Sequence, residues 1–207
     1  DEQSDGPIVR LLGLLNCPVV ELRKQWRLVF FSEPALGGLQ VGVATPMQKV
    51  MIKGQHEGWP FEPYEGTFAG SYDLALARAE QEAFQVVVIP GQDVTNATVS
   101  VSTLQPVSGQ GAFNGQVNVW VVGHVKGAAQ PRKDLNIEYP PYLVDYNLTD
   151  NGGWWPDPLL TFMSSCSINA GDRVAFWVNV TTKSDTPPGD YTATVTVSAT
   201  GETPVAL

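Results

Sequence analysis

Aromatic side chains gather in two stretches of this sequence, residues 54–70 and residues 142–155. Exposed aromatic rings stack on the C–H faces of sugars, and polar groups beside the rings can bind the hydroxyls. Both stretches are therefore candidate carbohydrate-binding segments. In an extended chain the adjacent Trp154 and Trp155 point in opposite directions, which predicts one solvent-facing indole. The six candidate residues are Trp59, Tyr64, Tyr142, Tyr146, Trp154 and Trp155.

Three aspartates near the second aromatic stretch could do acid–base chemistry: Asp145, Asp150 and Asp157. Glycoside hydrolysis commonly needs two carboxylates held at a fixed separation beside a sugar-sized cleft. A structural interpretation is favoured for Asp157, which lies between two prolines and would accept backbone N–H bonds in a turn. In that interpretation the neighbouring Trp155 closes the end of the fold, and no catalytic residue is expected.

Metal and cofactor chemistry finds little support in the sequence. The two histidines, His56 and His124, are far apart, whereas transition-metal sites need clustered His or Cys ligands. A calcium ion on loop oxygens is the less favoured alternative, because no known calcium-loop spacing is present. We therefore expect no cofactor. The candidate calcium ligands would be Asp145, Asn147, Asp150 and Asn151.

Other catalytic classes are excluded by the residue patterns. The glycine-rich loops lack the strand, helix and Lys-Ser/Thr context of a phosphate-binding loop, and two isolated histidines nominate no Ser-His-Asp set. Arg78 lies close to Glu80 and Glu82, and we expect it to bridge these carboxylates as a structural clamp.

Charge and cysteine content limit the partners and the compartment. The formal net charge of −9 disfavours nucleic acid and anionic membrane surfaces, whereas neutral glycans remain possible ligands. The first apolar stretch, residues 8–20, is too short and too interrupted to span a membrane. Cys17 and Cys166 could form a disulfide in an oxidising compartment, or both could be buried free thiols; the sequence leaves both alternatives open.

Alternating apolar and polar residues predict the elements that must position these groups. Residues 99–102 and 192–197 alternate as half-buried strands do, and residues 117–122 and 174–180 are more continuously apolar, as central strands are. Turn-forming Gly, Pro, Asn and Asp residues separate the runs. The pattern predicts an all-β fold: a two-sheet antiparallel β-sandwich, jelly-roll or immunoglobulin-like, with long aromatic loops.

Further strands are predicted in two other parts of the chain. Residues 71–85 have good helix propensity, but a strand-like run follows at once, so we predict two strands joined through Arg78 to Glu82. Residues 26–31 and 39–43 are further predicted strands. We divide the chain into residues 1–35, a linker or the remnant of a preceding module, and residues 36–207, the β-sandwich domain.

Three spaced blocks resemble the β-sandwich domain that precedes the catalytic barrel in glycoside hydrolase family 123-like proteins. The first joins residues 41–50 to the Ala77–Val88 stretch, which matches the family's A-R-x-E-x-E-x-F-Q pattern. The second is residues 152–160, similar to the family's W-x-P-D-P-L segment, and the third is residues 187–191. Together the blocks extend over roughly residues 40 to 200.

The resemblance implies an accessory role and carries no catalytic residue to this chain. The family's catalytic Asp-Glu pair belongs to the barrel, and no Asp-Glu pair in a matching sequence context is found here. We expect a non-catalytic module of a secreted bacterial carbohydrate-active enzyme, extracellular or periplasmic, with a glycan and a C-terminal catalytic domain as partners. The alternatives are an autonomous carbohydrate-binding module and a structural or adhesive surface domain without ligand.

Overall fold

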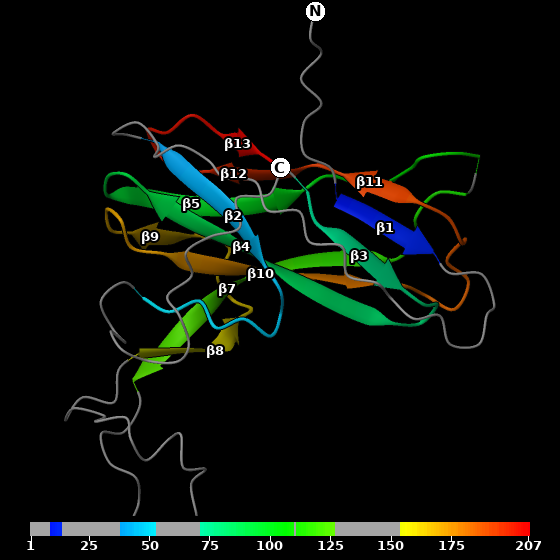
Figure 1. Ribbon diagram of the computed structural model, residues 1–207, viewed down its shortest axis with the longest axis horizontal. Coiled ribbons are helices and arrows are strands. Elements are labelled where there is room, and N and C mark those ends of the chain that lie inside the picture. The colour runs from blue at the N-terminus through cyan, green and yellow to red at the C-terminus, as the bar shows by residue number, and fades with distance from the viewer. Residues whose placement is uncertain (1–8, 14–37, 53–70, 110, 127–153) are drawn as a thin grey trace, which may run out of the picture.

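All the regular secondary structure in the described part of the chain is β-strand, as the alternating residue pattern predicted. The computed structural model describes residues 9–13, 38–52, 71–109, 111–126 and 154–207 (Figure 1). Within these ranges no helix is long and apolar enough to cross a membrane. The strands are β1 (Val9–Gly13), β2 (Leu39–Ala44), β3 (Asp73–Leu76), β4 (Gln81–Pro90), β5 (Val94–Val101), β6 (Gln105–Pro106), β7 (Gln116–Lys126), β8 (Trp154–Leu160), β9 (Cys166–Ile168), β10 (Val174–Thr181), β11 (Tyr191–Ala193), β12 (Val195–Ser198) and β13 (Val205–Ala206).

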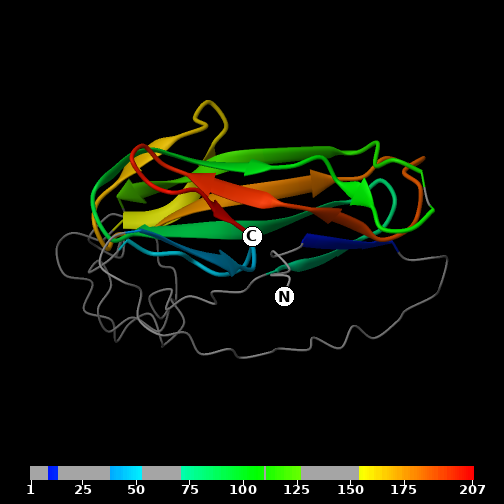
Figure 2. The same ribbon diagram turned by 90° about the horizontal axis from the view of Figure 1, so that it is seen from above.

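One layer is a five-stranded antiparallel sheet in the order β2-β4-β10-β7-β8. The long apolar runs of β4 and β10 lie side by side in its middle, where both faces of a strand are covered. Strand β8 lies at one edge of the sheet. Figure 2 shows these strands running along the long axis of the molecule.

The second layer consists of two four-stranded halves, β3-β1-β11-β6 and β13-β12-β5-β9. The halves are continuous because only one residue, Thr194, separates β11 from β12, and the Ser102 N–H donates to its carbonyl at 2.9 Å. Figure 1 shows the halves lying end to end. All pairs in this layer are antiparallel except β1 with β3, which is parallel.

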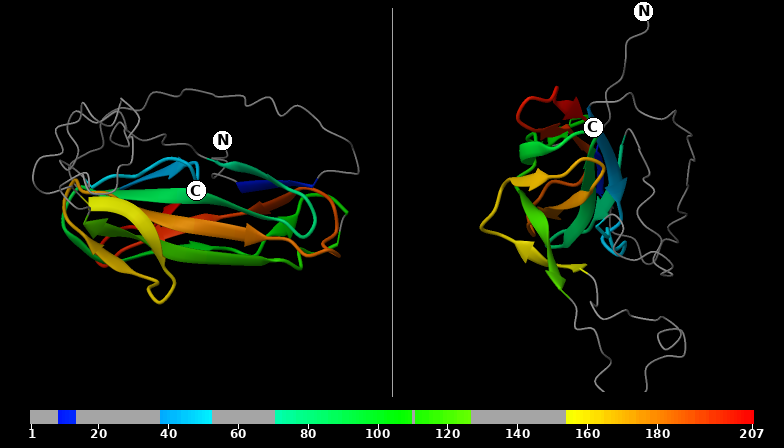
Figure 3. Two further views of the ribbon diagram at one scale, coloured as in Figure 1. Left: turned by 90° about the horizontal axis from the view of Figure 1, so that it is seen from below. Right: turned by 90° about the vertical axis from the view of Figure 1, so that its left-hand side faces the viewer.

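The main hydrophobic core lies between the two layers. Phe84, Phe176 and Val178 reach it from the five-stranded sheet, and Tyr191 and Val197 reach it from the second layer, all at most 1% exposed. Core-facing residues alternate with outward-facing residues along each strand, so the sequence neighbours of these five residues face outward. The end-on view in Figure 3 shows the layered arrangement. The all-β sandwich predicted from the sequence is confirmed.

Residues 71–90 form two strands and no helix, as predicted. Strand β3 ends at Leu76 and β4 begins at Gln81, so the connection lies at residues 77–80, slightly earlier than the predicted Arg78–Glu82. Ala79 adopts a left-handed backbone conformation in this turn, with φ of 56°.

The division of the chain at residue 35 stays a prediction. Residues 9–13 form β1, which pairs with β3 and β11 of the second layer, so this part of the predicted linker is a strand of the sheet. The predicted strand at residues 26–31 and the aromatic stretch at residues 54–70 lie outside the described residues.

Candidate functional site

The outer face of the five-stranded sheet carries a second, smaller hydrophobic cluster. Val87, Ala175 and Val122 come from neighbouring strands and pack with Ala44 and Val50. Val50 is fully buried, although it lies beyond the end of β2. The segment that follows β2 therefore crosses over the outer face and covers this part of the sheet.

Gln85 fixes this crossing segment to the sheet. Its side chain is 3% exposed, and its Nε2 donates to the backbone carbonyls of Thr45 at 2.8 Å and of Gln48 at 2.7 Å. The Gln48 N–H also donates to the Thr45 carbonyl at 3.1 Å, which closes a turn. One buried amide thus supplies donors to two carbonyls and holds residues 45–49 in place.

Strand β8 forms the opposite wall, and its bulge determines which side chains face the site. Val122 pairs with Leu159 and His124 with Pro156, so β8 has one more residue than β7 between these pairs. Prolines cannot donate to the ladder and are found at sheet edges and bulges, which suits this edge strand. Lys49 Nζ donates to the Pro156 carbonyl at 3.3 Å and joins the crossing segment to β8.

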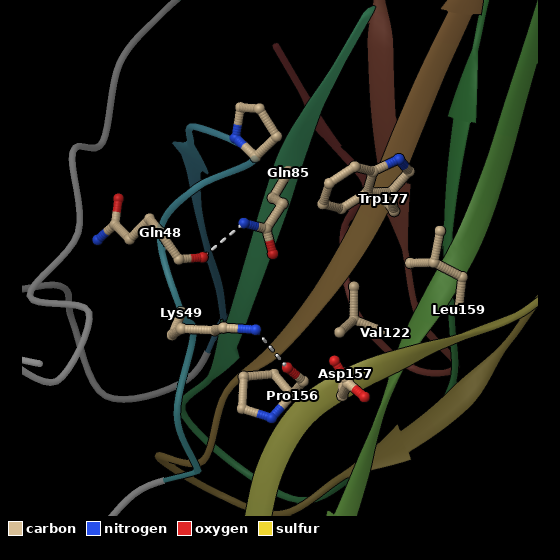
Figure 4. A pocket seen from close by; sticks show the side chains of 9 residues that line it. Gln48, Lys49, Gln85, Val122, Pro156, Asp157, Leu159 and Trp177 are labelled. Atoms are coloured by element: carbon tan, nitrogen blue, oxygen red, sulfur yellow. Dashed lines mark hydrogen bonds between the residues drawn. The ribbon is translucent and has the colours of Figure 1, made fainter. Parts of the chain in front are cut away.

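A pocket of about 220 Å³ lies between the crossing segment and β8. Figure 4 shows Trp177 and Gln85 side by side at the sheet and Gln48 and Lys49 on the crossing segment. The pocket is smaller than the ~300–1,000 Å³ typical for drug-sized ligands, which limits it to a group of roughly one sugar ring. Its lining residues are Pro46, Gln48, Lys49, Gln85, Val122, Pro156, Asp157, Leu159 and Trp177.

The pocket combines an indole with both charged and neutral polar groups. Lys49, Asp157 and Gln48 are exposed at its rim, and Trp177 is half-buried. An ammonium group donates, a carboxylate accepts, and an amide does both. The pocket can therefore hold a ligand that presents an apolar face together with hydroxyl or amide groups.

His124 lies beneath the crossing segment rather than in the pocket lining. Its Nε2 is 3.4 Å from the Val50 carbonyl. Burial lowers the pKa of His124, and the contact with the Val50 carbonyl and the charge of Asp172 partly oppose this effect. Folding therefore shifts the protonation equilibrium of His124 toward the neutral imidazole.

Of the six predicted carbohydrate-binding residues, only the two adjacent tryptophans lie in the described part of the chain. Trp154 is 41% exposed and Trp155 is half-buried, and both belong to β8 rather than to a loop. Neither lines the pocket. The residues outside the described ranges are Trp59, Tyr64, Tyr142 and Tyr146.

The expected role of Asp157 in a turn is wrong, because Asp157 lies within β8 and its exposed carboxylate borders the pocket. A Pro-Asp-Pro sequence is typical of turns, but an edge strand with a bulge accommodates both prolines as well. The other two candidate acids, Asp145 and Asp150, lie outside the described residues.

The clamp formed by Arg78 also differs from the expectation. Arg78 lies in the turn between β3 and β4, and its Nε donates to the Thr186 carbonyl at 3.1 Å. The carboxylate of Glu80 accepts instead from the Ala77 N–H within the same turn. Arg78 therefore joins two loops, because the tight turn directs it away from the strand face that it was expected to share with Glu80 and Glu82.

Metal binding and disulfide formation stay untested predictions. Among the described residues, no three His, Cys, Asp or Glu side chains are grouped to hold a metal ion. The candidate calcium ligands and His56 lie outside these residues. Cys166 on β9 is a half-buried free thiol in the described part, and burial raises its pKa to about 11. Its possible partner Cys17 lies outside the described residues.

Sequence reasoning missed Gln48, Lys49 and Trp177 as pocket residues. A signal was present, because two of the blocks that carry the family resemblance meet at the pocket. Residues 46–49 and Gln85 come from the first block, and Pro156 and Asp157 from the second. Trp177 gave no such signal, since a tryptophan in an apolar strand is typical of a core.

Comparisons with known proteins give a likeness of fold. No protein-family model matches this sequence, and no curated protein sequence matches it. Among solved structures, the chain is similar to one described under glycolipid glycan hydrolysis by a family 123 glycoside hydrolase from Clostridium perfringens, with a TM-score of 0.56 and 15% sequence identity. The match covers 82% of this chain and 26% of that one, so this chain spans about a quarter of the hydrolase. The chain thus shares a β-sandwich fold with part of a glycoside hydrolase.

Proposed function

We propose that this chain is a non-catalytic accessory β-sandwich of a secreted carbohydrate-active protein. The observation that carries the proposal is the unequal coverage of the structural match, which takes in 82% of this chain but only 26% of the family 123 hydrolase. A domain of this extent fits a role beside a catalytic region. In this proposal the partners are a catalytic domain of the same polypeptide and a glycan.

The composition of the pocket supports binding rather than cleavage. The common glycosidase mechanisms use two carboxyl groups on opposite sides of the scissile bond. In the described residues that line the pocket, Asp157 is the only carboxylate. Trp177, Gln48 and Lys49 supply stacking and hydrogen bonding but no second acid. The pocket is therefore suited to hold a sugar without breaking a glycosidic bond.

The test is to measure turnover and binding with the same protein preparation. We expect no product release from aryl glycosides of N-acetylhexosamines or from soluble polysaccharides, and we expect retention of the protein by at least one glycan on an array. The control is Asp157→Asn, which keeps the shape of the side chain and removes its charge. Product release that Asp157→Asn abolishes would show a catalytic role and contradict the proposal.

A further inference from the structure

Two tryptophans and four polar residues form a continuous strip beside the pocket. On β7 and β10, Trp120 lies directly opposite Trp177, and the next two pairs on the same face are Asn118 with Asn179 and Gln116 with Thr181. Successive pairs on one face are about 7 Å apart, because each strand rises about 3.4 Å per residue. We call this strip the indole–amide face. It is continuous with the pocket because Trp177 belongs to both.

The polar part of the indole–amide face contains an unsatisfied hydrogen-bond acceptor. Asn179 is 2% exposed, and its Nδ2 donates to Thr181 Oγ1 at 3.3 Å. In the described structure Asn179 Oδ1 is buried and has no hydrogen-bond partner. On the neighbouring strand β7, Asn118 Oδ1 accepts a hydrogen bond from Gln116 Nε2 at 3.1 Å. Buried polar atoms are almost always paired in folded proteins, but this oxygen is covered by its neighbours, so the amides of this face that a ligand can reach are those of the half-buried Asn118 and the exposed Gln116.

The chemistry of the face fits a neutral carbohydrate. Directly paired side chains lie about 5 Å apart at Cβ, so the half-buried side chains of Trp120 and Trp177 are neighbours on this face and form an apolar patch. Sugar rings have apolar C–H faces that stack on such patches, and their hydroxyls donate and accept hydrogen bonds. Gln116, Asn118 and Thr181 offer both kinds of partner next to the patch. The net charge of −9 disfavours an acidic polysaccharide.

We propose that the indole–amide face binds a neutral glycan chain that runs along β7 and β10, with one sugar ring on Trp120 and Trp177. Hydroxyls of the glycan bond to the amides of Asn118 and Gln116, and the pocket beside Trp177 receives the neighbouring ring. This inference deepens the proposed function and rests on it for the class of ligand, since it names which side chains of the sandwich contact the glycan.

Affinity electrophoresis tests the site with soluble neutral polysaccharides in native gels: hydroxyethyl cellulose, mixed-linkage β-glucan, galactomannan and xylan. We expect at least one to retard the wild-type protein, and polygalacturonate to retard it less. Trp120→Ala should weaken that retention at least tenfold, and Asn118→Ala by several-fold. Trp154→Ala is the matched control, because Trp154 is an exposed indole on β8, outside the face. Circular dichroism confirms that each variant is folded.

The outcomes separate this inference from the proposed function. Retention lost in folded Trp120→Ala and kept in Trp154→Ala supports the indole–amide face. Retention lost in Trp154→Ala and kept in Trp120→Ala overturns it, while an accessory glycan-binding role stands. If no neutral polysaccharide retards the wild-type protein, the inference is also overturned. Product release in the turnover assay contradicts the proposed function and leaves the measured affinity of the face as it is.

Discussion

At the scale of single residues, Gln85 holds one wall of the pocket in place. The segment after β2 has no strand partner of its own at residues 45–49, and Gln85 supplies the donors for two of its carbonyls. The sequence alone marked Gln85 as part of a family pattern, but it could not reveal the role. Gln85 and Gln48 are 37 residues apart in sequence, so the hydrogen bond between them depends on the tertiary fold.

Replacing Gln85 with leucine should destabilise the protein by about 2 kcal/mol. The substitution keeps the volume but removes the donors to two carbonyls, and an unsatisfied buried carbonyl costs about 1–3 kcal/mol. Urea unfolding measures the change. Gln48→Ala is the matched control, because Gln48 contributes its backbone carbonyl and its side chain is exposed. An equal loss of stability in both variants would contradict the role assigned to the Gln85 side chain.

The pKa of His124 predicts a loss of stability on mild acidification. Burial lowers this pKa below the 6.5 of an unfolded histidine, so at pH values between the two the unfolded chain binds more protons. The unfolding free energy is therefore not reduced by His124 above about pH 6.5, and it decreases as the pH falls toward the pKa of His124 in the folded protein.

Urea unfolding at several pH values between 5 and 7.5 measures this effect. His124→Gln should flatten the dependence of the unfolding free energy on pH in this range, because it removes the titrating imidazole. A slope that persists unchanged in His124→Gln would contradict the assignment to this histidine.

At the scale of elements, the sequence predicted strands well and the edge of the sheet poorly. The run at residues 84–89 predicted β4 correctly, because it is strongly apolar and rich in β-branched residues. A helix over residues 71–85 would have too few residues in which to end before this run. The sequence predicts a turn at the Trp-Trp-Pro-Asp-Pro segment, since proline and aspartate are typical turn residues. It is β8, an edge strand whose outer side needs no ladder hydrogen bonds.

The turn between β3 and β4 is joined to the loop after β10 by Thr182. Its hydroxyl donates to the Ala77 carbonyl at 2.6 Å and accepts from the Glu80 N–H at 3.0 Å. Thr182→Val keeps the shape and removes both bonds, so we expect a loss of about 1–3 kcal/mol. Chemical denaturation measures it against Thr196→Val, a half-buried position on β12. A change within about 0.5 kcal/mol at Thr182 would show that the two loops do not depend on this hydroxyl.

At the scale of the whole molecule, the proposed binding surface lies on the outer face of the five-stranded sheet. The crossing segment covers one part of this face with apolar side chains, and the indole–amide face lies next to it. Pattern analysis placed Trp120 and Trp177 in strands but could not pair them, because the register between β7 and β10 is a property of the fold. The prediction of a solvent-facing indole at Trp154 or Trp155 needed only their adjacency in sequence and no strand register.

The most direct test of the glycan-binding account is the spectrum of the tryptophan indole N–H groups with and without a retained polysaccharide fragment. The chain has six tryptophans, and single Trp→Phe variants assign each signal in a ¹⁵N-correlated spectrum. We predict that the signals of Trp120 and Trp177 shift on titration while those of Trp154 and Trp155 stay in place. Shifts confined to Trp154 and Trp155 would contradict the account and place the binding surface on β8.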